Sequence, residues 1–221
     1  MIRAWLQRWW FRATSTATKR AATRIKQLSR RDRRRMLAHF LALDASDRLL
    51  RFGMALSDES VTSYVQGIDF ERDTVYGVIN RAFRVVAVGH LAFAPKEKLV
   101  SGQATSKEKV AEFGVSVSAS ARGLGIGSKL FERAAIGCRN ADVDTLYMHC
   151  LASNKTMIHI ARKAGMEIQR DYGEADAYLR LLPPSPGTVL QEAFEEQAAV
   201  IDYAIKANAK AFGRLFKFKR K

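Results

Sequence analysis

Residues 110–127 read Val110-Ala-Glu-Phe-Gly-Val-Ser-Val-Ser118, then Ala-Ser, then Ala121-Arg-Gly-Leu-Gly-Ile-Gly127. The first part alternates between apolar and small or polar residues, which predicts a β-strand, and the second part is a glycine-rich turn. The residues after it, 128–141, have the apolar periodicity of a helix. A strand, a tight turn and a helix N-terminus in this order direct backbone N–H groups and the positive end of the helix dipole toward one point. Because glycine lets the main chain approach a ligand closely, we predict a phosphate or pyrophosphate site.

Two nucleotide-binding motifs compete for this turn. The dinucleotide fingerprint requires Gly-x-Gly-x-x-Gly, whereas the glycines here are spaced Gly-x-Gly-x-Gly, although Asp144 lies about where a ribose-binding acid would fall. The P-loop requires Gly-Lys-Ser/Thr, and Gly127-Ser128-Lys129 reverses that order. A tight strand-to-helix turn without a ligand is the third interpretation.

Two segments resemble the GNAT acyltransferases. Arg122-Gly-Leu-Gly-Ile-Gly127 is similar to that family's Gln/Arg-x-x-Gly-x-Gly/Ala signature, and Asn154 to Met166 resembles its Asn-led helix that ends in Gly-Phe. A predicted strand at 145–151 joins them. More distantly, residues 43–69 resemble the start of the acyltransferase domain of bacterial protein-lysine acetyltransferases. The resemblance covers roughly residues 24–182. It implies an α/β fold with a mixed, mostly antiparallel sheet that is split beside an acyl-CoA site and has helices on both faces.

The resemblance also implies the residues that bind acetyl-CoA. The pyrophosphate would lie on the turn formed by Arg122, Gly123, Leu124, Gly125, Ile126 and Gly127. The end of the preceding strand, Val115, Ser116 and Val117, would pair with the pantetheine arm, and Asn154 would contact the same arm. The two cysteines have neither a disulfide framework nor a metal-ligand spacing, so no metal site is predicted.

Glu112 is the predicted general base, because the family often places an acid at this point of the strand and a carboxylate can remove a proton from an amine. Asp69 and Glu71 are the lesser candidates. The general acid has no counterpart, since Ala161 occupies the position where many GNAT enzymes have a tyrosine. Three polar groups are near in sequence, none of them at the matching position: Tyr147, Cys150 and His159.

The charge of the chain is concentrated at its two ends. Of a net +15 over 221 residues, residues 1–35 contribute +11, from twelve basic and one acidic residue. Residues 206–221 contribute +7, with no acidic residue, which leaves −3 for the middle. A near-neutral body with basic ends indicates charged appendages rather than a nucleic-acid-binding core, so specific nucleic-acid binding is not expected.

Both ends also have amphipathic helical patterns. Residues 1–20 place five apolar residues on one face: Ile2, Trp5, Leu6, Trp9 and Trp10. A helix predicted from residue 188 has a second stripe of Phe194, Ala198, Ile201, Ile205 and Phe212, with Glu192, Glu195, Glu196 and Lys206 off it. Such a stripe must be buried, and the candidates are the domain's own surface, a second copy in a homodimer, the N-terminal helix or a bilayer. No apolar run approaches the ~20 residues of a membrane span.

The expected organisation is an extension at 1–20, an acyltransferase-like domain at 21–182, a proline-rich linker at 183–187, and a helix with a basic tail at 188–221. Residues 44–52 are expected to form a connector, and 96–109 a polar loop. The expected function is acyl-CoA-dependent N-acyl transfer, acetyl first, to a primary amine of a protein lysine or a small molecule, in a ternary complex. The alternatives are a CoA-binding sensor or scaffold without catalysis, and an interaction protein that binds membranes or nucleic acid through its ends. The expected location is the cytoplasm, with peripheral contact at the inner membrane face.

Overall fold

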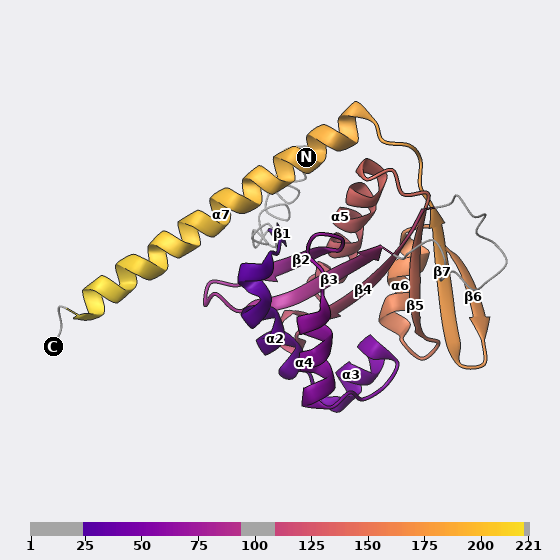
Figure 1. Ribbon diagram of the computed structural model, residues 1–221, viewed down its shortest axis with the longest axis horizontal. Helices are drawn as coiled ribbons and strands as arrows, with labels where there is room; N and C mark the ends of the chain where they lie inside the picture. The colour runs from indigo at the N-terminus through magenta and orange to yellow at the C-terminus, as the bar shows by residue number, and fades with distance from the viewer. Residues whose placement is uncertain (1–23, 94–108, 219–221) are drawn as a thin grey trace, which may run out of the picture.

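The computed structural model describes residues 24–93 and 109–218, with side chains up to Ala209. Its centre is one seven-stranded sheet of order β1-β2-β3-β4-β5-β7-β6, in which every neighbouring pair is antiparallel except β4 and β5 (Figure 1). The strands are β1 (Lys26–Gln27), β2 (Thr74–Ile79), β3 (Val85–Phe93), β4 (Val110–Val117), β5 (Thr145–Leu151), β6 (Glu167–Asp171) and β7 (Glu174–Arg180). The mixed, mostly antiparallel sheet expected from the sequence is confirmed.

The sheet splits between β4 and β5. These two strands pair only at Val110↔Thr145, Ala111↔Leu146 and Glu112↔Tyr147, and then separate. On its other edge β4 stays paired with β3 as far as Val117, while β5 pairs with β7 over its whole length. Residues 113–117 therefore have no strand neighbour on the β5 side.

Helices cover both faces of the sheet. The helices α2 (Arg33–Leu41), α3 (Ala45–Phe52) and α4 (Asp58–Gly67) precede β2, with a 3₁₀ turn, η1 (Arg30–Asp32), before them. On the opposite face lie α5 (Ile126–Asn140), which follows the 3₁₀ turn η2 (Ala119–Ala121), and α6 (Lys155–Lys163). Two apolar clusters result: Phe40 and Val65 pack on one side of the sheet, and Phe113 and Leu130 on the other.

Residues 44–52 were expected to be a connector, and this prediction was wrong because they form α3. The Asp44 side chain caps the helix by accepting a hydrogen bond from the Asp47 amide at 2.7 Å. Gly53 ends it in the left-handed conformation (φ 76°), which glycine adopts without steric cost. The two caps explain why an eight-residue segment stays helical.

The C-terminal helix, α7 (Pro186–Phe218), begins inside the predicted linker, since a proline in the first turn needs no N–H partner. It docks through its polar face. The Arg133 side chain, 2% exposed on α5, contacts Glu192 at 2.8 Å, Glu195 at 3.3 Å and Glu196 at 3.7 Å. Farther along, Tyr203 packs against Phe83, with 5.4 Å between the ring centroids. Asn140 Nδ2 also donates to Glu192, and Arg35 to the Tyr203 hydroxyl. Charge pairing, hydrogen bonds and the packing of Tyr203 therefore hold α7 on the body.

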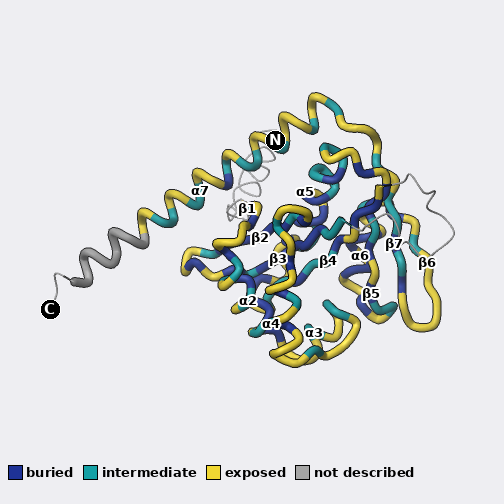
Figure 2. Tube along the Cα trace, in the orientation of Figure 1, coloured by how far each residue is buried: buried dark blue, intermediate teal, exposed yellow. Residues whose placement is uncertain are grey.

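The part of the α7 stripe whose side chains are described, up to Ile205, is not buried against the domain, which corrects one of the four options left open by the sequence. Phe194 is 73% exposed, Ile201 57% and Ile205 64%. In Figure 2 most of the described part of α7 has the colour of exposed residues. The reason is geometric: the stripe lies on the side of the helix opposite Glu192 and Ala199, and these two residues face the body. Residues 1–20, which carry the other predicted stripe, lie outside the described residues. So do residues 96–108 of the loop predicted at 96–109. Among those described, no helix combines the length and apolar composition needed to cross a bilayer.

The Arg133 contacts give a stability prediction. Glu192→Ala should lower the free energy of unfolding by about 2–3 kcal/mol, because it leaves a desolvated guanidinium without its nearest carboxylate. Glu132→Ala is the matched control: its 3.5 Å pair with Lys163 is exposed, so the change should stay within ~1 kcal/mol. Chemical denaturation of the three proteins measures both changes. Equal stability of the two variants would show that the polar face of α7 does not hold the helix in place.

Candidate functional site

A cavity of about 520 Å³ opens where β4 and β5 separate. Its floor is the end of β4, one wall is the glycine turn with the start of α5, and the other walls come from α3 and α6. Most of the binding residues predicted from the sequence line it: Val115, Ser116, Val117, Arg122, Gly123, Gly125, Ile126, Gly127 and Asn154. Leu124, also predicted, is 48% exposed and does not line it. The structure therefore brings all but one of the predicted binding residues around a single cavity.

The glycine turn has the geometry of an anion cradle. Gly123 and Gly125 adopt φ +73° and +71°, and a Cβ built on either would meet no atom within 4 Å. Gly125 is the N-cap of α5 and supplies no side-chain cap. The first N–H groups of α5 consequently have no intrahelical partner and are directed toward the open space. Backbone, rather than side chains, provides this end of the cavity with its affinity for anions.

Two contacts fix α3 as a wall of the cavity, which the sequence did not indicate. Asp47 pairs with Arg122 of the glycine turn at 2.5 Å, and Arg122 Nε donates to the Val117 carbonyl at 3.1 Å. Asn154 Nδ2 donates to the Leu50 carbonyl at 3.1 Å. A signal for this helix exists in the sequence, because Asp44 and Gly53 are spaced as the two caps of a short helix.

Asn154 is buried and has a structural role. Its Oδ1 accepts the Met157 amide at 3.1 Å and so caps α6, while Nδ2 holds α3. One amide N–H remains available for a ligand, because the Nδ2 group carries two hydrogens. The predicted contact to the pantetheine arm stays a prediction.

The hydroxyl of Ser116 is engaged with α2, although the residue lines the cavity. Its Oγ lies 2.6 Å from His39 Nε2, and His39 Nδ1 lies 3.2 Å from Ser118 Oγ. Burial lowers the pKa of His39 to about 4, so this histidine is neutral near pH 7. Because the side chain is engaged with α2, a ligand in the cavity would meet Ser116 through its backbone.

Glu112 stands at the apex of the split. It is the last residue of β4 that pairs with β5, opposite Tyr147, and it is exposed. It borders the split without lining the cavity itself. The two lesser candidates come earlier in the chain, in the α4–β2 turn, where Asp69 accepts the Glu71 amide at 3.0 Å and Glu71 pairs with Arg30 at 3.2 Å.

Tyr147 and Cys150, two of the groups considered as general acid, do not line the cavity. Ala161 is 2% exposed in the core, so α6 offers no hydroxyl there. The Tyr147 hydroxyl donates to Asp176 at 2.5 Å, and burial, together with this bond, raises its pKa. Burial also raises the pKa of the Cys150 thiol. His159 lines the cavity from α6. The described residues contain no group of three or more His, Cys, Asp or Glu placed to hold a metal ion.

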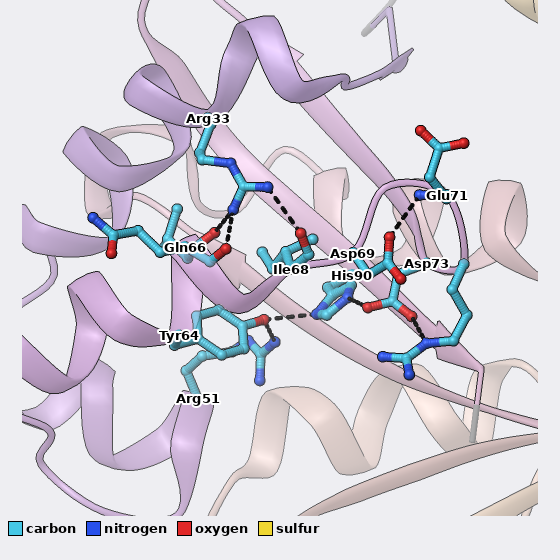
Figure 3. A network of polar contacts seen from close by, with 11 residues as sticks. Arg33, Arg51, Tyr64, Gln66, Ile68, Asp69, Glu71, Asp73 and His90 are labelled. Carbon is cyan, nitrogen blue, oxygen red and sulfur yellow. Dashed lines mark hydrogen bonds and ion pairs between the residues drawn. The ribbon is translucent and has the colours of Figure 1, made fainter. Parts of the chain in front are cut away.

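A polar network that sequence reasoning missed extends from Arg51 through Tyr64 and His90 to Asp73 (Figure 3). Arg51, which lines the cavity, donates through Nη2 to the Tyr64 hydroxyl at 2.9 Å. Tyr64 lies 2.8 Å from His90 Nδ1, and His90 Nε2 lies 3.1 Å from Asp73 Oδ2. The four residues come from α3, α4, β3 and the residue before β2. No local pattern could have indicated the network, because it depends on tertiary packing.

The chain matches the Acetyltransferase (GNAT) family over residues 5–166. No curated protein matches it by sequence. Among solved structures it is similar to the GNAT domain of S. lividans PAT, with a TM-score of 0.58 and 19% identity, covering 71% of this chain and 89% of that one.

Two further solved structures show the same fold. The ribosomal-protein-alanine N-acetyltransferase from Brucella melitensis has a TM-score of 0.51 and 19% identity over 71% of this chain and 99% of that one. The spermidine N-acetyltransferase from Vibrio cholerae, in complex with CoA and spermine, has a TM-score of 0.53 and 15% identity over 71% and 94%. At these identities the likeness concerns the fold.

The anion cradle gives a binding prediction. Gly125→Asp should abolish CoA binding measured by calorimetry, because the new carboxylate enters the open space that the helix N-terminus makes attractive to anions. Gly173→Asp is the matched control, since Gly173 also has a positive φ (+92°) and open space at its Cβ but lies in the β6–β7 turn. Wild-type affinity in a folded Gly125→Asp variant would rule out the cradle.

Proposed function

Because the chain belongs to the GNAT acetyltransferase family, we propose that it transfers an acyl group, acetyl first of all, from acyl-CoA to a primary amine. The observation that carries this proposal is the cavity at the β4–β5 split, which has an anion cradle at one end and an unpaired strand edge along its floor. The cradle suits the pyrophosphate of CoA. The free edge of residues 115–117 suits the amide groups of a pantetheine arm, which can pair with it as a strand would.

In the proposed reaction, donor and acceptor meet in a ternary complex. The amine must first lose a proton, and Glu112 at the apex of the split accepts it directly or through a water molecule. The neutral amine nitrogen then attacks the thioester carbonyl carbon, the C–S bond breaks, and CoA leaves as a thiolate. The nitrogen gives up its second excess proton to solvent, and the thiolate takes a proton from solvent. Acyl transfer therefore needs no covalent enzyme intermediate. The absence of a tyrosine at Ala161 is consistent with protonation of the thiolate by solvent.

The acceptor is proposed only as a class, namely a primary amine on a protein lysine or a small molecule. Thiol release from acetyl-CoA in the presence of peptides, polyamines and amino acids tests it directly. Turnover with any of these amines supports the enzyme. Tight CoA binding without turnover would instead support a CoA-binding sensor or scaffold.

The proposed base gives a kinetic prediction. Glu112→Gln should lower kcat by about 10²–10⁴, the usual contribution of a positioned general base, and leave the Kd for CoA unchanged. The rise of the rate with pH should also become shallower. Glu132→Gln on the exposed face of α5 is the control for loss of one carboxylate. If Glu112→Gln kept the wild-type rate and pH profile, Asp69 and Glu71 would be the next residues to test.

We also propose that α7 and the basic tail after it bind the surface of an anionic bilayer, at the inner face of the cytoplasmic membrane. The exposed stripe of α7 supports this. Its large side chains are apolar, and the charged residues between Val189 and Ile205 lie off the stripe. The seven basic residues from 206 to 221 would add attraction of roughly 1 kcal/mol each near such a surface. Apolar insertion and charge would then act together.

Vesicle sedimentation tests the membrane proposal. The full chain should bind vesicles that contain anionic lipid, should be released by salt, and should ignore zwitterionic vesicles. Replacing Ile201 and Ile205 together by Gln should weaken binding without loss of stability, because both side chains are exposed. If these changes left vesicle binding intact but converted a dimer into a monomer in analytical ultracentrifugation, the stripe would be a subunit interface instead.

A further inference from the structure

The Arg51 guanidinium lies flat over Gly114 at one end of the cavity at the β4–β5 split. A Cβ built on Gly114 would fall 2.5 Å from Nη2, 2.6 Å from Cζ and 2.7 Å from Nη1. Such similar distances place the plane of the guanidinium across the position that any other residue's side chain would fill. Glycine at 114 is therefore required for Arg51 to approach β4, and Arg51 lines the cavity from this position.

The hydrogen-bond network behind Arg51 allows only one arrangement of protons. Asp73 Oδ2 accepts from His90 Nε2 at 3.1 Å, so that nitrogen carries the hydrogen of a neutral imidazole. His90 Nδ1 must then accept from the Tyr64 hydroxyl at 2.8 Å. The Tyr64 oxygen in turn accepts from Arg51 Nη2 at 2.9 Å (Figure 3). Every donor points from Arg51 toward Asp73, which fixes the guanidinium and commits the Tyr64 proton to His90.

Among the described residues, Arg51 has no carboxylate partner. Its Nε is also buried and makes no hydrogen bond within the described part of the chain. The network offers it a phenol rather than an anion, since Asp73 is occupied by His90 and by Arg72 at 3.0 Å. The pKa of His90 is lowered by burial and then by the Arg51 charge, and the same two causes act on His39. A partly desolvated cation without a counter-charge favours an anion in the adjacent cavity.

We propose that Arg51 is a catalytic residue that stabilises the oxyanion of the tetrahedral intermediate, an inference that rests on the proposed acyl transfer. Its position supports this role. Gly114, which the guanidinium covers, is two residues from Glu112 on the same face of β4, a spacing of about 7 Å along a strand. A thioester carbonyl between the two would have the base on the side of the amine and the cation on the side of the oxygen.

In this step the amine lone pair forms the new C–N bond and the carbonyl π electrons move to the oxygen, which Arg51 then contacts. The proton that made the amine an ammonium ion has already gone to Glu112, and the nitrogen loses its second excess proton to solvent. The oxyanion collapses to restore C=O and breaks the C–S bond, so the electron pair leaves with sulfur. Arg51 gains and loses no proton, because a guanidinium stays protonated throughout the working pH range.

Tyr64 and His90 are positioning residues in this scheme, since they act on the reaction only through Arg51. The competing use of the same cation is recognition of a carboxylate at the end of the acyl chain, as in a succinyl donor. The geometry favours the oxyanion, because the guanidinium is held at the strand that forms the cavity floor and next to the proposed base.

The test compares Arg51→Met and Arg51→Lys with Arg34→Met, a matched change at an exposed arginine of α2. With acetyl-CoA, Arg51→Met should lower kcat by about 10²–10³, the usual effect of removing one oxyanion donor, and Arg51→Lys should recover part of that loss. The calorimetric Kd for CoA, which has no acyl group, should stay within about twofold of wild type, as should KM for acetyl-CoA. Tyr64→Phe should lower kcat by about tenfold without changing the pH profile.

Each contrary result overturns the inference in a distinguishable way. Wild-type kcat in Arg51→Met removes the role while leaving the proposed function intact. Loss of CoA affinity in the folded variant assigns Arg51 to donor binding instead. Loss of activity with succinyl-CoA but not with acetyl-CoA assigns it to the acyl carboxylate. An inactive wild-type protein overturns the proposed function, and this inference with it.

Discussion

The structure depends on a parallel strand pairing that lasts for three residues. After Glu112↔Tyr147, β4 keeps its partner on one edge only, and the backbone groups of residues 113–117 on the other edge have no strand to bond. Unpaired peptide groups in a partly buried place are costly unless a ligand or water satisfies them. α3 contacts both separated strands and so occupies the mouth of the split. The cavity, its wall and the free strand edge therefore follow from one local failure of pairing.

Two arginines in this chain show how the protein treats a desolvated cation in different places. Arg133 on α5 is surrounded by three carboxylates of α7, and the result is attachment of a helix. Arg51 is held by a phenol and has no carboxylate partner in the described part of the chain. The charge of Arg133 is neutralised by carboxylates within the fold, whereas the charge of Arg51 remains available to a ligand in the cavity. The difference lies in the partners and not in the residue type.

Local patterns were sufficient for much of the fold. The strand at 145–151 was predicted at its observed bounds, because a short apolar segment between turn signals marks it clearly. Residues 44–52 were missed, since a helix of two turns has little periodicity and is recognised mainly by its caps. The docked face of α7 could not be predicted either, because periodicity identifies the apolar face and does not reveal that Arg133 attracts the opposite one. The Arg51 network depends on the register His90↔Gly114, which no local sequence pattern contains.

Because α7 is long, its C-terminal end lies away from the body of the domain. Among the described side chains, the last hydrogen bond to the body runs from Lys206 Nζ to the Ile79 carbonyl at 3.0 Å, and Ala207 is the last side chain that packs on the body. The helix continues to Phe218. At 1.5 Å per residue, the part beyond Lys206 is about 18 Å long. Figure 1 shows the C-terminal end of α7 leading away from the sheet and its helices. The basic tail is thus carried on a stiff arm. A molecule bound to this part of α7 would stay within a limited distance of the cavity. Its effective concentration at the cavity would then depend on the length of the helix rather than on its affinity for the cavity.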